Sequence, residues 1–296
     1  MSEKTVLITG CTHGGIGHSL ALDFHTRGYT VLASARRASQ IADLAERGLT
    51  TLSLDVTDRN SIEDAKREVE ALIADGLIAG LDVLVNNAGR NCTMPALDVD
   101  LDDARHCFET NVFGVMAMCQ AFTPLLIKQK GLIVNIGSVA AIIPYVFGST
   151  YNASKAALHA YSRTLRLELA PLGVRVMVVV TGGVQSNIAR TKRTLPPSSL
   201  YLDIEDDFQR RVVHSQDGAM ANREFARGVV DAVVRGGRRT LWRGNKSWLV
   251  WFARSWVGGW IFDLLLPSMF GLGRLGGLVR ERERGGGKGG KGGKGL

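Results

Sequence analysis

Short apolar runs alternate along the chain with stretches whose apolar residues recur at helical spacing. The runs rich in β-branched residues predict strands at Thr5–Thr9, Thr30–Ala33, Thr51–Leu54, Asp82–Val85, Leu132–Ile136 and Val174–Val180. The amphipathic stretches predict helices at Ile16–Arg27, Ile41–Arg47 and Ser61–Ala74, within Leu101–Lys130, and at Tyr151–Ala170. Because strand and helix alternate and the strands are apolar throughout, the pattern indicates an α/β fold, a Rossmann-like doubly wound parallel sheet.

The alternation stops after Val180. Residues 187–221 contain Pro196, Pro197 and the mixed-charge run DIEDDFQRR, which predicts a long irregular insertion. An insertion after the sixth strand lies near the carboxyl ends of the strands, where ligands bind in such sheets. We interpret 187–221 as a substrate lid, with a solvated loop as the alternative.

All five tryptophans lie between Trp242 and Trp260. The apolar stretch Ser247–Leu266 contains Arg254, Asp263 and a Gly-Gly pair, which argue against a simple spanning helix. Clustered tryptophans flanked by basic residues are typical of a membrane interface; the basic residues are Arg238, Arg239, Arg243 and Lys246. We predict a membrane-associating extension at 241–275. The alternative is a helix packed on the domain or in a dimer contact.

These patterns divide the chain into a catalytic domain at 1–240, the tryptophan-rich segment at 241–275 and a basic, flexible Gly/Lys-rich tail at 276–296. The net charge is +8, but seven basic and two acidic residues lie between Gly271 and Leu296. The basicity therefore belongs mostly to the tail, and we expect no nucleic-acid partner.

The remaining composition indicates a cytosolic protein without a metal site. The four cysteines show no CxxC spacing, and the six histidines have no ligand-like spacing. The N-terminus starts a strand at once and lacks the features of a secretory signal. Together with the tryptophan-rich segment, this predicts the cytosolic face of a membrane (endoplasmic reticulum or lipid droplet), or otherwise the cytoplasm.

A glycine-rich loop, TGCTHGGIG, follows the first strand and opens the first helix. Its candidate cofactor-binding residues are Gly10, Gly15, Ile16 and Gly17. Glycines at this place permit a tight turn and let the backbone approach a pyrophosphate at the helix N-terminus. The loop predicts a nucleotide site.

The second strand ends in SARR rather than in an acidic residue. A carboxylate there would bind the ribose 2′-hydroxyl of NAD, whereas the guanidinium groups of Arg36 and Arg37 match the 2′-phosphate of NADP. We therefore predict NADP(H), with a solvated arginine pair as the alternative.

Two further strand ends carry polar residues. Asp55 follows the third strand and can accept from the adenine amino group, or cap the next helix, which has nearer caps in Asn60 and Ser61. Asn87 and Gly89 belong to the NNAG run that closes the fourth strand. They can brace the sheet and line the adenosine pocket, although a surface turn uses the same residues.

A candidate proton relay follows the fifth strand. Tyr151 and Lys155 stand four residues apart and project from one helix face, so an ammonium lies beside a phenol and favours the phenolate. Ser138 follows the fifth strand, where its hydroxyl can bind a substrate oxygen.

Taken together, these motifs resemble the short-chain dehydrogenase/reductase family. The resemblance rests on TGCTHGGIG, Asn86–Gly89, Asn111, Ser138, Tyr151-xxx-Lys155 and Thr181–Ser186, and it covers Lys4 to Arg190. The glycine loop is one residue longer than the commonest form, and Thr181 stands where a proline is usual. The longer loop, the stretch from Tyr151 and the tryptophan-rich end are similar to the fungal branch that contains 1-acyl-dihydroxyacetone-phosphate reductase, whose relatives also serve secondary metabolism.

The resemblance implies a role for each catalytic residue. Tyr151 exchanges the proton of the substrate oxygen, and Ser138 holds that oxygen. Lys155 binds the nicotinamide ribose and depresses the pKa of Tyr151, while Asn111 holds a water that links Lys155 to solvent. Ser186, after Gly182, helps to place the nicotinamide carboxamide, and Gly183 and Val184 are further candidate cofactor-binding residues. A dimer or tetramer, paired through the helices around 101–130 and 151–170, is implied as well.

The sequence therefore predicts an NADP(H)-dependent oxidoreductase that interconverts a ketone and a secondary alcohol on a hydrophobic or lipid-like substrate. A terpenoid or polyketide substrate of secondary metabolism is the alternative within this class. A non-catalytic nucleotide-binding scaffold is the alternative from another class.

Overall fold

A seven-stranded, all-parallel sheet forms the centre of the molecule, which we describe from a computed structural model that covers residues 3–189 and 193–286. The strands are β1 (Thr5–Ile8), β2 (Thr30–Ala35), β3 (Thr50–Ser53), β4 (Val83–Asn86), β5 (Leu132–Ile136), β6 (Arg175–Thr181) and β7 (Thr240–Arg243). Their order in the sheet is β3-β2-β1-β4-β5-β6-β7, so the order reverses between β1 and β4. The predicted doubly wound sheet is confirmed.

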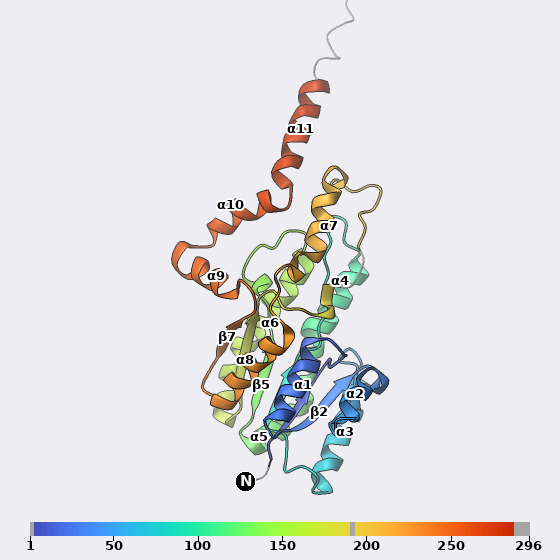
Figure 1. Cartoon of the computed structure of the whole chain (residues 1–296), viewed down its shortest axis with the longest axis vertical. Helices are drawn as coiled ribbons and strands as arrows, with labels where there is room; N and C mark the ends of the chain where they lie inside the picture. Colours follow the sequence, from blue (N-terminus) through green and yellow to red (C-terminus); the bar gives the residue numbers. More distant parts are fainter. Residues whose placement is uncertain (1–2, 190–192, 287–296) are drawn as a thin grey trace, which may run out of the picture.

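Helices cover both faces of this sheet (Figure 1). Along β1, Val6 and Ile8 pack toward α1 (Ile16–Thr26) and α8 (Asn222–Arg235), whereas Leu7 packs toward the opposite layer. That layer contains α3 (Arg59–Ala74), α5 (Gly114–Gln129) and α6 (Ser149–Leu169). Because alternate residues of a strand enter different apolar layers, the strands are apolar throughout.

The remaining helices of the nucleotide-binding half are short or interrupted. The predicted helix at Ile41–Arg47 is a 3₁₀ turn followed by α2 (Ala42–Ala45). The predicted helix within Leu101–Lys130 is α4 (Leu101–Phe108), a π-helical turn at Glu109–Phe113, and α5. Asp58, rather than the expected Asn60 or Ser61, caps α3 by accepting from the Asn60 N–H at 2.9 Å.

The seventh strand corrects the predicted domain boundary. β7 pairs in parallel with β6, from Val178 opposite Thr240 to Thr181 opposite Arg243. A division at residue 240 therefore cuts through the sheet. Trp242, which we expected in the membrane-associating segment, lies in this strand and is half-buried.

A third apolar cluster joins the lid to the end of the chain. The lid contains α7 (Glu205–Val213), whose Ile204-to-Val212 face packs on helices that follow β7. These are α9 (Ser247–Phe252), α10 (Trp260–Met269) and α11 (Leu272–Gly286), of which α11 extends beyond α7 in Figure 1. Their buried members are Val250, Phe262, Leu266 and Phe270. The segment 241–275 is therefore packed on the lid along one face.

The expected flexible tail is helical at its start. α11 continues to Gly286, so the prediction of a flexible segment from 276 is wrong up to that residue; the run GGGKGGKGGKGL lies mostly outside the described residues, from 287 onward. Within the described ranges, Leu101–Gln129 is long and apolar enough to cross a membrane, but 56% of its most apolar stretch is buried inside the fold. α10 and α11 satisfy the same test only as a pair bent by 70°.

Candidate active site

The glycine-rich loop lies at the point where the strand order reverses, between β1 and α1. Gly10 and Gly14 have positive φ angles of 72° and 73°, which favour glycine. A Cβ on Gly17 would lie 2.5 Å from both the Asn87 Nδ2 and the Gly10 carbonyl oxygen. The loop therefore depends on glycine for its turn and for the close approach of β4 to α1.

Asn87 braces this loop from the end of β4. Its Nδ2 donates to the carbonyl oxygens of Thr9 and Gly10 at 2.8 and 3.0 Å. Gly89 leaves room between the Asn111 amide and the Lys155 amine, since a Cβ there would lie 3.2 Å from Asn111 Oδ1 and 3.6 Å from Lys155 Nζ. The sheet-bracing interpretation of NNAG agrees with these contacts.

A cavity of about 420 Å³ opens between the glycine loop and the segment after β6. It is lined by Gly14, Gln185, Ser186, Asn187, Val213, Gln216 and Asn222. Asn187 donates to the His13 carbonyl oxygen, and its own Oδ1 is buried beside Gly14 with no hydrogen-bond partner among the described residues. An unpartnered polar atom, glycines that leave the backbone open and the N-terminus of α1 together fit a dinucleotide.

The segment after β6 is fixed by backbone contacts. Gly183 bridges Asn245, Val184 bridges Met220 and is buried, and the Ser186 N–H donates to Gln216 Oε1 at 3.1 Å. Of the predicted residues, Ser186 lines the cavity and is held by the lid residue Gln216, whereas Gly183 and Val184 lie just before it in the chain. Thr181 keeps its place in the β6–β7 ladder opposite Arg243.

Arg36 and Arg37 are exposed at the end of β2. Within the described residues, neither forms an ion pair, so both guanidinium groups are free for a ligand. Asp55 is less available than we expected, because its Oδ1 accepts from the backbone and hydroxyl of Thr57 at 2.9 and 2.7 Å. Its role toward adenine stays a prediction.

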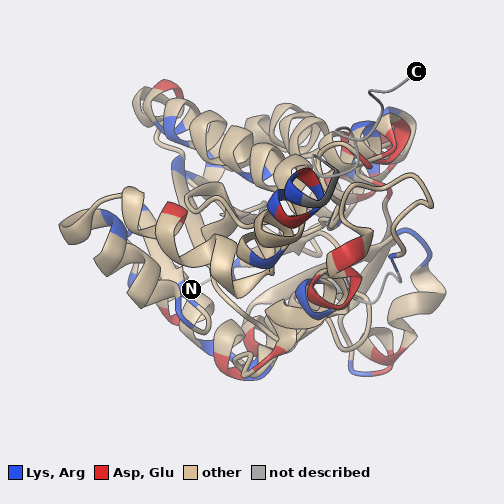
Figure 2. Ribbon diagram, turned by 90° about the horizontal axis from the view of Figure 1, so that it is seen from above, with Lys and Arg blue, Asp and Glu red and all other residues tan. Residues whose placement is uncertain are grey.

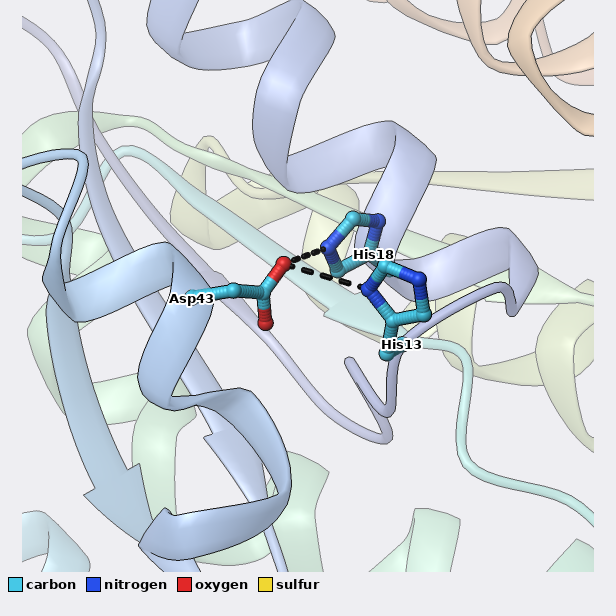
Figure 3. Close-up of side chains that lie close together, drawn as sticks. All are labelled: His13, His18 and Asp43. Carbon is cyan, nitrogen blue, oxygen red and sulfur yellow. Dashed lines mark hydrogen bonds and ion pairs between the residues drawn. The ribbon is translucent and has the colours of Figure 1, made fainter.

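A cluster beside this loop was not expected from the sequence. His13, on the loop, and His18, on α1, both point at Asp43 of α2 (Figure 3). The His18 Nε2 and His13 Nδ1 lie 2.7 and 3.2 Å from one Asp43 oxygen, and these bonds contribute to holding the pKa of Asp43 below its usual range against the opposing effect of burial. The cluster ties the glycine loop to α2; the two histidines lie 30 and 25 residues before Asp43, so sequence spacing does not reveal the cluster.

Tyr151, Lys155 and Ser138 gather at the carboxyl end of β5. Tyr151 and Lys155 lie in the first two turns of α6, with Lys155 Nζ 5.9 Å from the centre of the Tyr151 ring. The Lys155 ammonium is buried and donates to the Ile136 carbonyl oxygen at 3.0 Å. Ser138 is buried at the end of β5, where its Oγ accepts from the Ala140 N–H.

Burial dominates the pKa values of this group. Burial raises the pKa of the Tyr151 phenol to about 12, although the Ser138 hydroxyl and the Arg211 guanidinium lower it. Burial also lowers the pKa of Lys155 to about 8. Loss of hydration outweighs the groups that lower the pKa of Tyr151, and a depression of that pKa by Lys155 stays a prediction.

Asn111 lies in the π-helical turn between α4 and α5. Its Nδ2 donates to the Arg90 carbonyl oxygen and to Ser154 Oγ, both at 3.0 Å, and its Oδ1 accepts from the Arg90 N–H. Turns of this kind are frequent at functional sites. The side chain joins the loop after β4 to α6, and its part in a water relay stays a prediction.

His159 is a second residue that the sequence analysis missed. The Ser138 N–H donates to its Nε2 at 3.2 Å, and burial, with the nearby Lys155 charge, lowers the pKa of His159 to about 4. A neutral imidazole can accept this bond, so His159 fixes the backbone that carries Ser138. A Cβ on Gly137 would lie 2.0 Å from the same nitrogen, which explains the glycine there.

The arrangement places a buried ammonium, a phenol and a hydroxyl beside a glycine-built nucleotide cradle. The family described as short chain dehydrogenase matches residues 4–196. The chain belongs to this family. It is therefore an oxidoreductase of the short-chain dehydrogenase/reductase type.

Fungal relatives match this short-chain dehydrogenase over much of its length. A protein of Schizosaccharomyces pombe named NADPH-dependent 1-acyldihydroxyacetone phosphate reductase is 48% identical over 206 residues, 68% of each chain. The short-chain dehydrogenase srdE of Neurospora crassa is 39% identical over 277 residues, 93% of this chain and 94% of its own.

Solved structures show the same fold. A short-chain dehydrogenase from Streptomyces avermitilis superposes with a TM-score of 0.71 at 27% identity, over 84% of this chain and 91% of its own. One from Burkholderia cenocepacia, in complex with NADP, has a TM-score of 0.69 at 25% identity, over 90% of this chain and 98% of its own.

Proposed function

We propose that this protein is an NADP(H)-dependent reductase that interconverts a ketone and a secondary alcohol on a hydrophobic or lipid-like substrate. The observation that carries the proposal is the meeting of Tyr151, Lys155 and Ser138 at the end of β5. They stand beside a glycine loop that can hold a dinucleotide.

Each residue of the group has one task. Tyr151 gives or takes the proton of the substrate oxygen, and Ser138 binds that oxygen. Lys155 binds the nicotinamide ribose, and Asn111 supports the proton path through its contacts with α6. The cofactor supplies the hydride, while the protein orients it and moves the proton.

The cofactor is NADP(H) rather than NAD(H). Two exposed arginines without ion pairs within the described residues follow β2, where a carboxylate would select NAD. The Schizosaccharomyces pombe relative is NADPH-dependent by its name, and the Burkholderia cenocepacia structure contains NADP.

The substrate is apolar on one side of its ketone. The loop after Ser138 carries Val139, Ile142, Ile143, Tyr145 and Val146, which pack with the lid and the terminal helices. Our first choice is a 1-acyl-dihydroxyacetone-phosphate-like ketone, supported by the relative at 48% identity. A phosphate-free terpenoid or polyketide ketone is the second choice, supported by relatives such as srdE that align over 93% of the chain.

The protein meets this substrate at a membrane on its cytosolic side. Four tryptophans of the terminal segment are exposed: Trp248, Trp251, Trp256 and Trp260. From Ser247 to Met269 the only charged residues in the sequence are Arg254, in the turn between α9 and α10, and Asp263 of α10. Figure 2 colours the charged residues of the whole molecule. With 6 and 10 residues, α9 and α10 are about 9 and 15 Å long, too short to span about 30 Å of hydrocarbon, so they lie in the interface.

A homo-oligomer is part of the proposal. Phe113, at the end of the π-helical turn before α5, and Leu167 of α6 are exposed, 52% and 67% respectively. These helices are the ones through which members of this family usually pair.

The experiment is the consumption of NADPH by the full-length protein in detergent. A 1-acyl-dihydroxyacetone phosphate is compared with terpenoid and polyketide ketones that lack phosphate. Preference for the phosphorylated lipid supports the first choice, and turnover of the others alone supports the second. If no ketone is reduced while NADPH still binds, the protein is a nucleotide-binding scaffold and the proposal fails.

A further inference from the structure

The lid contains a buried arginine that pairs with no carboxylate in the part of the chain the structure describes. Arg211 of α7 is 2% exposed. Its Nε donates to the Val146 carbonyl oxygen at 2.7 Å, and its guanidinium carbon lies 3.5 Å from the centre of the Tyr145 ring. Within the described ranges, neither Nη nitrogen has a hydrogen-bond acceptor, so two donors of a fixed fork remain available.

A carboxylate stands near by but serves other residues. Asp207 lies four residues before Arg211 on the same helix, a spacing at which side chains meet. It pairs instead with Arg210 and with Arg274 Nη2, the latter at 2.7 Å. A buried charge without a partner is costly, and groups of this kind cluster at functional sites.

Arg211 lies next to the catalytic helix. Its Nη2 is 3.1 Å from the place that a Cβ on Gly148 would take, and Gly148 directly precedes α6. Tyr151 is the third residue of that helix, and the Arg211 guanidinium lowers the pKa of its phenol, in opposition to burial. The backbone N–H groups that open this 21-residue helix add a second positive potential at the same place.

We propose that Arg211 and the N-terminus of α6 form a subsite for a phosphate monoester carried by the substrate near its ketone. The two Nη donors match two phosphate oxygens, since Nε is occupied by Val146. A phosphate monoester carries about −1.5 to −2 charges at pH 7, which one guanidinium and a helix N-terminus together balance better than either alone. The subsite rests on the proposed reductase function and names its substrate class.

The test compares two ketones that differ only in phosphate: a 1-acyl-dihydroxyacetone phosphate and the same acyl-dihydroxyacetone. The full-length protein is compared with Arg211→Met and Arg211→Lys. Loss of a charge-assisted bidentate contact is expected to lower kcat/KM for the phosphorylated ketone by about 10- to 100-fold. For the neutral ketone, the kcat/KM of the Arg211 variants is expected to stay within about twofold of the wild-type value. Arg210→Met is the matched control, because Arg210 is the exposed neighbour on the same helix, and it is expected to leave both values unchanged.

A direct binding measurement accompanies the kinetics. In the presence of saturating NADPH, inorganic phosphate is expected to raise the melting temperature of the wild type and of Arg210→Met but not of Arg211→Met. If Arg211→Met fails to fold, Arg211→Lys keeps the charge but loses the fork, and it is expected to lose activity on the phosphorylated ketone alone.

Other outcomes overturn the subsite. If Arg211→Met lowers kcat/KM equally for both ketones, Arg211 only positions Tyr151. It could do so through Asn152, whose Oδ1 has no partner among the described residues and lies 3.2 Å from the Gly148 Cβ position. If Arg211→Met keeps the wild-type kcat/KM on both ketones and the wild-type response to phosphate, no anion binds at Arg211. Failure of the wild type on every ketone refutes the reductase function, whereas reduction of the neutral ketone without preference for phosphate refutes the subsite alone.

Discussion

At the scale of single residues, burial determines the charges of the candidate site. Lys155 keeps its ammonium inside the protein at a cost, since its pKa falls from 10.5 to about 8. The same loss of hydration raises the pKa of Tyr151, so its proton stays in place throughout the neutral range. A phenol that remains protonated is suited to donate a proton in ketone reduction.

This cost predicts an effect on stability. Below pH 8 the lysine is protonated in both the folded and the unfolded chain, and folding carries the full penalty. Between pH 8 and 10.5 only the unfolded chain keeps the proton, so the free energy of unfolding of the wild type rises with pH. Lys155→Met is therefore expected to be inactive yet more stable at pH 7, by up to about 3 kcal/mol, with the gain shrinking toward pH 10.5.

Urea unfolding at pH 7 and near pH 10 measures this gain. Lys4→Met, at an exposed position, serves as the control and is expected to change little. A Lys155→Met variant that is less stable than the wild type at pH 7 would show that the bond to Ile136 outweighs the burial of the charge.

The sequence predicted the reacting groups and missed their supports. Tyr151, Lys155 and Ser138 are recognisable because their spacing and their places after strands carry the signal. His159 and Arg211 are single residues on helices, and the groups that they contact lie 21 and 65 residues away. Only the folded chain brings such partners together, so no local pattern could reveal them.

At the scale of elements, the first six strands were predictable and β7 was not. Each of the six is an apolar run between helical stretches, which is the pattern of a buried parallel strand. β7 has four residues, TLWR, of which only Leu241 is buried, and it follows two arginines. Its pairing with β6 is set by contacts across some 60 residues, which periodicity does not report.

The turn between β1 and α1 is the element most sensitive to substitution. Gly17→Ala is expected to displace Asn87 or the Gly10 backbone, because the new Cβ would lie 2.5 Å from each. We expect a loss of about 1–3 kcal/mol in the free energy of unfolding, as for other overpacked sites, together with weaker NADPH binding.

Gly273→Ala is the matched control for that substitution. Gly273 lies in α11 with no atom within 4 Å of the added Cβ, so alanine there is expected to be neutral or to stabilise by up to about 1 kcal/mol. Thermal unfolding and NADPH titration test both variants. If Gly17→Ala and Gly273→Ala had the same stability and the same NADPH affinity, the close approach of the loop to β4 would be contradicted.

At the scale of the whole molecule, the terminal helices have two faces with different tasks. Val250, Phe262, Leu266 and Phe270 pack on the lid, so truncation after Arg239 would remove β7 and part of this apolar cluster. The opposite face exposes Phe252, Trp256, Trp260 and Leu264, which stand four residues apart in the sequence. The two interpretations left open by the sequence, packing and membrane contact, therefore apply to different faces of one segment.

Membrane binding is expected to depend on the exposed face alone. Full-length protein with Trp248, Trp251, Trp256 and Trp260 changed to serine is expected to stay folded and to be released from vesicles of phosphatidylcholine and anionic lipid. The four side chains are 45% to 74% exposed, so their removal leaves the apolar cluster intact. Co-sedimentation measures the effect.

Serine at Leu77 and Leu97 provides the control, since both leucines are about as exposed but lie outside the terminal helices. That variant is expected to keep its vesicle binding. Retention of the tryptophan variant on vesicles would show that another surface binds the membrane.

The central claim, reduction of a ketone through Tyr151, is tested most directly by one comparison. NADPH oxidation with the best ketone substrate is measured for the wild type and for Tyr151→Phe, with NADPH affinity determined for both. Loss of the general acid is expected to lower turnover by about 10²- to 10⁴-fold while NADPH binding is unchanged. Turnover by Tyr151→Phe at the wild-type rate would contradict the account, because another group would then supply the proton.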